Sequence, residues 1–460
     1  TFGPTFRAEN SNTSRHLAEF WMVEPEIAFA DLSDNMDLAE DFLKSILDSL
    51  LTHRADDMNF FDQRIERGLK ERLHHVIETP FRRLPYTEAI GILDAAHERG
   101  LSVVFGLWAG QERQGFDYND GRAVAAQLAQ FREVVREYKG HPAILMWGLG
   151  NENDLFYTDF KVWDALNDIA EMIHEEDPNH PVMHVTAGLD VAEVQLIMER
   201  APAIDVYGIN TYGELVGGTS DLRSYGYEGP SVGVQLRRAG WDGPYVIAEW
   251  GPDGHWEVPK TAWGVPIEQT SHEKAQMYRI RYERGIAADP VSCIGSYAFL
   301  WGDKQETTPT WYGIFTPGGY ETEVLDELQY LWTGAYPENR APSLTAYTAN
   351  GQDRYASVFV DPRSQVAFEA TVTDPDGDAL RYEWELLPES TDIRAGGDAE
   401  TRPDAVRLDV VRRDGGALTI RAPRLEGPYR MFVYVYDGNG NVATANLPFH
   451  VGRLPETAAR

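Results

Sequence analysis

Cysteine is almost absent from this chain, which has Cys293 as its single cysteine among 460 residues. One thiol excludes internal disulfides and any cysteine-rich zinc site. Long apolar runs are absent too, because no stretch approaches the roughly 18 residues that a membrane-spanning helix needs. We therefore expect no membrane span.

Positive charge is also scarce, since 41 Lys and Arg residues stand against 73 Asp and Glu residues and give a formal net charge of −32. A field of that sign repels phosphate backbones, so the composition disfavours nucleic acid as a partner. The chain opens at Thr1 with neither a methionine nor a basic-then-apolar leader. We therefore expect a mature form or a fragment.

Residues 92–335 alternate short β-rich apolar runs with longer helical stretches, a pattern typical of βα units around a parallel sheet. The expected strands are Leu101–Trp108, Ala143–Gly150, Val182–Ala187, Ile204–Thr211, Tyr245–Trp250 and Cys293–Leu300. The expected helices include Arg122–Tyr138, Lys161–Glu175 and Ser271–Gly285. Six strands are fewer than the eight that close a βα barrel.

The sequence pattern changes after a proline-bearing linker at residues 336–342. Residues 343–460 consist of short alternating runs broken by turn clusters such as Asp374–Asp378, which predicts a small antiparallel β-sandwich. That cluster lacks the downstream bidentate Glu of a calcium loop, so a turn is favoured over a metal site. The histidines His74, His75 and His184 lack a third ligand at a suitable spacing. We expect neither a metal nor a cofactor.

Two glutamates stand at the ends of expected strands, Glu152 after the run that begins at Ala143 and Glu249 after Tyr245 to Ala248. In a parallel βα barrel the C-terminal strand ends converge on one mouth, so these side chains can meet there. Either residue alone would more often be a helix cap or a surface carboxylate. Together they provide the two carboxyl groups that hydrolysis of a glycosidic bond requires.

The segment Gly140–Glu152 resembles the acid/base strand of clan A glycosidases, particularly the family 2-like barrels. The likeness continues through Tyr207–Tyr212, Tyr245–Gly251 and Gly295–Trp301, in the order of strands four, six, seven and eight of such barrels. It implies an α/β fold, an incomplete (β/α)8 TIM-type barrel with strands 3–8 present. Strands one and two would be missing.

The same resemblance assigns Glu152 as acid/base and Glu249 as nucleophile of a retaining mechanism. It implies that Asn151 holds the sugar 2-hydroxyl, that Tyr212 orients Glu249 and that Trp301 offers an apolar face to the ring. Further strand-end residues that could reach sugar hydroxyls are Asn210, Trp108, Gln111 and Glu112.

The first 91 residues have a strand-like pair and charged helical sequence, and Phe2–Glu26 resembles motif 2 of bacterial asparaginyl-tRNA synthetase, a class II enzyme. The resemblance implies an N-terminal α+β synthetase fragment in which Arg7 and Glu9 hold ATP, while Arg15 and His16 lie in the loop over the adenine. Motifs 1 and 3 are not found, so these would be vestigial ATP-binding residues. The two resemblances together indicate a chimera.

The favoured function is therefore a retaining β-glycosidase acting on an oligo- or polysaccharide, with activity that the missing strands could impair. Two alternatives remain open: an asparagine-tRNA ligase fragment, and a non-catalytic carbohydrate-binding protein. An exported location fits the glycosidase part, and a cytoplasmic one fits the synthetase-like part. Sugar and linkage are set by loop geometry, which the sequence does not specify.

Overall fold

The structure is a computed structural model, and it describes residues 2–6, 19–23, 32–64, 68–78, 86–216 and 230–453. The chain divides into two compact units, residues 1–92 and 93–460, which are described separately. Among the described residues, no helix combines the length and apolar character needed to cross a membrane.

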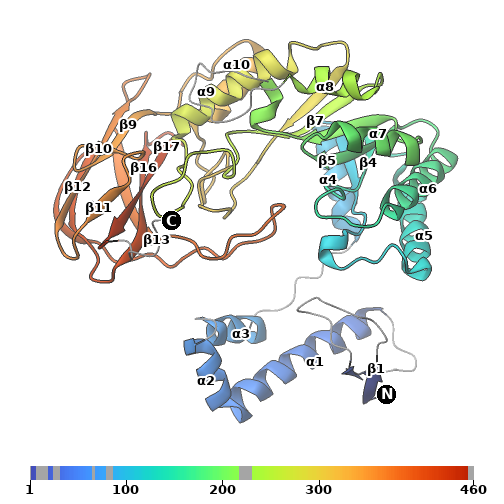
Figure 1. The fold of residues 1–460 in the computed structure, drawn as a ribbon, viewed down its shortest axis with the longest axis horizontal. Helices are drawn as coiled ribbons and strands as arrows, with labels where there is room; N and C mark the ends of the chain where they lie inside the picture. The colour runs from blue at the N-terminus through green and yellow to red at the C-terminus, as the bar shows by residue number, and fades with distance from the viewer. Residues whose placement is uncertain are drawn as a thin grey trace. The chain divides into compact units, whose positions relative to one another are not determined.

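The N-terminal unit combines an antiparallel hairpin with helices (Figure 1). Its elements are β1 (Phe2–Phe6), β2 (Glu19–Val23), α1 (Leu32–His53), α2 (Ala55–Arg64) and α3 (Leu69–Glu78), and α4 (Tyr86–Glu98) crosses into the second unit. Met58 is buried, whereas Phe42, Phe60 and Phe61 are exposed. In the described part of this unit, large apolar side chains of α1 and α2 are therefore exposed to solvent. Exposed apolar patches normally mark a surface that another part of a protein covers.

A parallel sheet organises the first part of the larger unit, with six strands in the described residues and the order β3-β4-β5-β6-β7-β8. The strands are β3 (Val103–Leu107), β4 (Ile144–Leu149), β5 (Val182–Ala187), β6 (Val206–Asn210), β7 (Tyr245–Trp250) and β8 (Cys293–Ala298). Strand order follows chain order, and a helix lies in each crossover, as neighbouring parallel strands require. The predicted incomplete barrel is confirmed.

Helices follow most of these strands, and several begin at a side-chain cap. They are α5 (Gly121–Tyr138), α6 (Lys161–Glu176), α7 (Val191–Arg200), α8 (Val232–Ala239), α9 (Ser271–Arg281) and α10 (Glu323–Thr333). Asp120 caps α5, and Thr270 forms a capping box with Glu273 at the start of α9. The predicted helix Ser271–Gly285 ends earlier, because a π-helical turn covers Tyr282–Ile286.

The sheet is open at both ends, so β3 and β8 are edge strands within the described residues. Interior strands such as β6 are buried throughout, whereas Ile294 and Tyr297 of β8 are exposed. The inner face of the arc is filled by apolar side chains including Met146, Val185 and Val246. The arc is therefore packed in its middle and unprotected at its edges.

The C-terminal part is the expected β-sandwich (Figure 1). One sheet has the order β10-β9-β12-β15-β14, and the other has the order β11-β17-β16-β13. The strands are β9 (Ser343–Ala349), β10 (Gln352–Asp353), β11 (Val358–Val360), β12 (Gln365–Thr373), β13 (Arg381–Pro388), β14 (Asp409–Asp414), β15 (Ala417–Arg421), β16 (Gly427–Tyr436) and β17 (Val442–Val451). Phe368, Met431 and Phe449 lie in the core between the sheets.

Strand β17 is buried along its whole length, because one face packs into the sandwich core and the other meets the βα part. Thr444 N donates to Ser271 Oγ at 3.0 Å, and Asn446 donates to the buried carboxylate of Glu268. The preceding connection is fixed as well, since Ala341 N donates to Asp326 Oδ2 at 2.8 Å. The sandwich is thus docked on the βα part.

Candidate active site

Glu152 follows β4 in a tight turn whose backbone is left-handed at two positions. Gly150 has φ 71°, and Glu152 itself has φ 51°. A non-glycine residue in that region costs about 1–2 kcal/mol, so the surrounding structure must hold it there. The Glu152 N–H donates to Val185 O at 2.9 Å, which ties the turn to β5.

Asn210 ends β6 and fixes two residues of that turn. Its Nδ2 donates to Glu152 Oε1 at 3.0 Å and to Asn151 Oδ1 at 3.2 Å. Asn210 is also the register partner of Glu249 on β7. The strand ends therefore bring Glu152, Asn151, Asn210 and Glu249 together, as convergence of parallel strand ends predicts.

Glu249 lies near the end of β7 and accepts a hydrogen bond from the Tyr212 hydroxyl at 3.2 Å. Burial, followed by the negative charge of Glu152, raises the pKa of Glu249 to about 8. Lys304 opposes that rise and Glu306 adds to it. The influence of Glu152 places the two carboxyl groups within electrostatic range of each other.

Aromatic rings surround Tyr212 on the same side of the sheet. The Tyr212 ring lies 5.7 Å from the Trp256 ring, 5.6 Å from the Tyr312 ring and 6.5 Å from the Phe299 ring, measured between centroids. Trp256 is 57% exposed, so its indole is open to a ligand next to the carboxyl pair.

Sequence reasoning missed Trp256 together with Lys304 and Glu306. Trp256 stands seven positions after Glu249 in the printed sequence, in the loop that follows β7, which is the one signal that could have drawn attention to it. Lys304 and Glu306 form an ion pair of 2.8 Å after β8, and nothing in their local sequence marks them.

The remaining predicted sugar-binding residues lie at strand ends but contact other groups. Gln111 is buried and its Nε2 donates to Asn151 O at 2.5 Å, so it supports the turn rather than facing solvent. Glu112 accepts the Thr158 and Asp159 backbone N–H groups. Trp108 is exposed beyond β3.

Trp301 lies beside Phe315 and Trp332, with ring centroids 5.4 Å and 6.4 Å away. Its role as a sugar platform stays a prediction. The ATP-binding residues expected from the synthetase resemblance, Arg7, Glu9, Arg15 and His16, lie outside the described residues.

His184 is fully enclosed on β5. One ring nitrogen, Nδ1, lies 2.7 Å from Leu149 O, and burial lowers the pKa of the imidazole to about 4. The ring is therefore neutral at pH 7, with Nδ1–H donating, and packs edge-on against Trp163.

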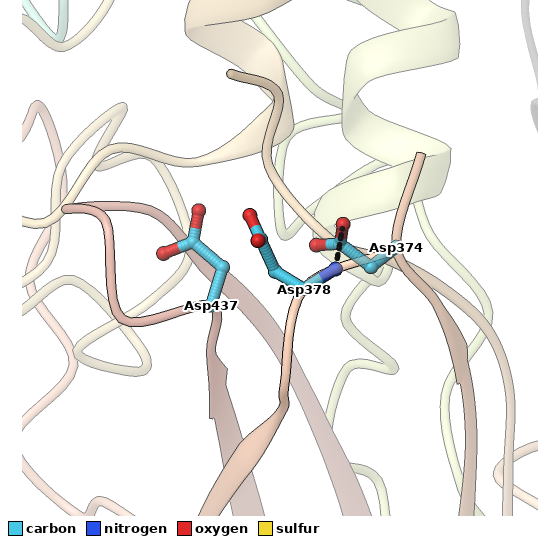
Figure 2. Close-up of side chains that lie close together, drawn as sticks. All are labelled: Asp374, Asp378 and Asp437. Carbon is cyan, nitrogen blue, oxygen red and sulfur yellow. Dashed lines mark hydrogen bonds between the residues drawn. The ribbon is translucent and has the colours of Figure 1, made fainter. Parts of the chain in front are cut away.

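The turn cluster in the sandwich contains one more acidic group than the sequence indicated. Asp437, far along the chain, brings a carboxylate oxygen within 4.8 Å of oxygens from Asp374 and Asp378 (Figure 2). Asp374 Oδ1 accepts the Asp378 N–H at 3.0 Å, which is the hydrogen bond of the expected turn. Asp437 accepts from Asn441 and Asn339 side chains at 2.9 Å and 2.7 Å. Asp374 thus shapes its own loop, whereas Asp437 also joins its loop to Asn339 of the linker.

Comparison with protein families gives a match to the tRNA synthetases class II (D, K and N) over residues 1–373, more than half of the chain. The asparagine–tRNA ligase of Colwellia psychrerythraea is 66% identical over 94 residues, which are 20% of this chain and 20% of that ligase. The ligase of Protochlamydia amoebophila is 48% identical over 145 residues, 32% of this chain and 28% of the ligase. The chain thus spans less than a third of the length of these relatives.

Comparison with solved structures gives glycoside hydrolases. An FMN-binding β-glucuronidase from Facaelibacterium prausnitzii L2-6 has a TM-score of 0.38 at 13% identity, covering 80% of this chain and 50% of that one. A family 39 glycoside hydrolase from Bacteroides cellulosilyticus WH2 has a TM-score of 0.40 at 12% identity, covering 76% and 71%. These likenesses are weak, so side-chain geometry has to support any function.

Proposed function

The chain belongs to the class II tRNA synthetases (D, K and N), and for its residues 93–460, which contain the Glu152 and Glu249 site, we propose a different activity: hydrolysis of β-glycosidic bonds with retention of configuration. The observation that carries this proposal is the hydrogen-bonded set in which Asn210 holds Glu152 and Tyr212 holds Glu249. Two such carboxyl groups at one mouth are what the reaction needs.

The proposed reaction starts from the form in which Glu152 carries the proton and Glu249 is ionised: Glu152 donates that proton to the leaving oxygen while Glu249 attacks the anomeric carbon. The bond to the leaving group breaks as a covalent glycosyl ester of Glu249 forms. Glu152, now ionised, then takes a proton from water, which displaces Glu249 and releases the sugar. Two inversions at one carbon give net retention.

Neighbouring side chains support these roles. Asn151 uses Oδ1 to accept from Asn210, which leaves its Nδ2 to donate to a sugar hydroxyl. That contact would strengthen in the oxocarbenium-like transition state and so accelerate the reaction. The Tyr212 hydroxyl donates to Glu249 and favours its ionised form. β-Glucosides and β-galactosides are the substrates to try first.

Covalent labelling tests the proposal. Incubation with dinitrophenyl 2-deoxy-2-fluoro-β-glucoside or -galactoside should add one glycosyl group to Glu249, as measured by intact mass and peptide mapping. The fluorine slows hydrolysis of the ester, so the adduct persists. A label on a different residue, or none with either reagent, would count against the assignment. Binding to insoluble glycans without release of reducing ends would favour a non-catalytic binding protein instead.

The labelling rate should rise with pH. Because the pKa of Glu249 is raised to about 8, its carboxyl is mostly protonated at pH 6 and mostly ionised at pH 9. Dinitrophenolate leaves without a proton, so the rate should follow ionised Glu249 and increase roughly 100-fold across that interval. A rate independent of pH between these values would contradict the proposal.

Two variants sharpen the pH test. Glu152→Gln removes a charge that raises the pKa of Glu249, so the pH midpoint of the labelling rate should move to lower pH in this variant. Tyr212→Phe removes a hydrogen bond that lowers this pKa, so its midpoint should move to higher pH. Opposite shifts from two neighbouring substitutions would not arise from a general loss of structure.

A second candidate function rests on the 66% identity over 94 residues to an asparagine–tRNA ligase. Retention of the ATP site would allow adenylate formation from asparagine. A pyrophosphate-exchange assay with asparagine and ATP decides this: exchange above a no-asparagine control supports the candidate, and no exchange removes it. Arg7→Ala is the matched variant for any exchange that is found.

A further inference from the structure

A long loop of the sandwich, residues 389–407, connects β13 to β14 and is named here the bridging loop (Figure 1). Its residues 396–400 contact the loops that follow β3 and β8. The segment is braced from within: Asp392 Oδ2 accepts the Thr401 N–H at 3.0 Å, and Glu400 Oε1 accepts the Arg394 N–H at 2.9 Å. It therefore has a defined shape rather than being free chain.

On one side, the bridging loop contacts the segment after β3. Asp398 Oδ2 forms an ion pair with Arg113 Nη1 at 3.0 Å, and Asp398 Oδ1 accepts from Gln114 Nε2 at 3.4 Å. Arg113 is 9% exposed, so this pair is shielded on the arginine side. A Cβ on Gly396 would lie 2.8 Å from Arg113 and equally close to Leu155, whose N–H donates to Glu152 O.

On the other side, the bridging loop contacts the segment after β8. Lys304 Nζ donates to Gly397 O at 2.7 Å, and Thr307 N donates to Glu400 Oε2 at 2.6 Å. Gly397 has φ +66°, and a Cβ there would lie 2.9 Å from Lys304 Nζ. Two adjacent glycines thus permit a close approach that side chains would obstruct.

These two sides are the ends of the open sheet. β3 and β8 are the edge strands in the described residues, and a closed barrel would place two further strands between them. The bridging loop instead links the loops that follow both edges. It also contacts residues next to the site: Leu155 is three positions after Glu152, and Lys304 is one of the charges that act on Glu249.

We propose that the bridging loop, held by Asp398 and Glu400, forms the side of the sugar cleft that the open sheet leaves unbuilt and holds Lys304 through Gly397 O. This inference rests on the proposed glycosidase function for its catalytic consequence. The contacts by which the bridging loop holds both edge loops do not depend on that function and can be tested without it. The bridging loop is thus a positioning and specificity-determining segment.

The test compares the double variant Asp398→Ala/Glu400→Ala with Arg402→Ala. Arg402 lies in the same loop but forms an ion pair with Glu385 on strand β13 of the sandwich and not with the βα part, so it is a matched control. Hydrogen exchange should speed up at residues 111–116 and 303–308 in the double variant and stay at the wild-type rate in the control. Unchanged exchange at both segments would overturn the proposal, whether or not the protein is active.

The catalytic arm uses aryl β-glycosides that the wild type hydrolyses. The double variant should raise KM about 10-fold with kcat changed less than about 3-fold, because a side of the cleft contributes to binding in ground and transition states alike. The pH midpoint of labelling should also move upward, since a loosened loop no longer fixes Lys304, whose charge lowers the pKa of Glu249. Faster exchange with a wild-type KM and midpoint would overturn the role in the cleft. Absence of labelling in the wild type would instead indicate failure of the proposed function. The hydrogen-exchange comparison would then still show whether the bridging loop holds both edge loops.

Discussion

Glu249→Ala should lower turnover of dinitrophenyl β-glycosides by about 10⁴-fold or more, because no other group then attacks the anomeric carbon. Azide should restore activity and give the α-glycosyl azide, since it enters from the face that Glu249 occupied. Steady-state kinetics and NMR of the product measure both effects. Circular dichroism should show an unchanged fold.

Glu152→Ala provides the contrasting result. Dinitrophenolate leaves without acid assistance, so the glycosyl-enzyme still forms, and azide should then attack it from the opposite face to give the β-glycosyl azide. Two products of opposite configuration from two single substitutions would establish which carboxylate attacks. The same product from both variants, or full activity in Glu249→Ala, would exclude the proposed roles.

Lys274→Met should lower the free energy of unfolding by about 3–5 kcal/mol, because it leaves the buried carboxylate of Glu268 without a counter-ion. Lys274 Nζ donates to Glu268 Oε1 at 2.6 Å, and both side chains are almost fully buried. Burial by itself would raise the pKa of Glu268, but the Lys274 charge and hydroxyl donors such as Thr308 hold it below its usual range. Urea unfolding followed by tryptophan fluorescence gives the measurement.

The double variant Lys274→Met/Glu268→Gln is the control for charge. It removes the uncompensated carboxylate and should regain part of the loss. Because the pKa of Glu268 is lowered in the folded state, its stabilising contribution is present above the unfolded-state pKa and is lost as pH falls through the folded-state value. The single variant should therefore show a weaker dependence of stability on acid pH. Equal destabilisation of the single and double variants would contradict this account.

Local pattern was sufficient for much of the secondary structure. The strands Val182–Ala187 and Tyr245–Trp250 were predicted with the bounds that the structure has, because runs of buried β-forming residues flanked by turns define them. Glu152 and Glu249 could be singled out because a parallel βα order makes strand ends converge. The edge strand β8 is shorter than predicted, since Phe299 and Leu300 pack beside Tyr212 and Tyr312 instead of continuing the ladder.

Contacts between distant segments could not be predicted in this way. The left-handed backbone of Glu152, the exposed indole of Trp256 near Tyr212 and the approach of Asp437 to Asp374 depend on how loops pack after the elements have formed. The rise in the pKa of Glu249 also depends on burial and on a charge from another strand. None of these has a periodic signature in sequence.

The sequence by itself determined the order of elements, the three unlike regions and the pair of glutamates, because hydrophobic period, turn residues and strand-end position are local properties of the chain. Only the tertiary structure decided that the sandwich docks through Asn446 on Glu268 and that residues 389–407 meet both edges of the open sheet. Those contacts join residues more than 90 positions apart, and their formation depends on complementary shape and charge that exist only once both surfaces have folded.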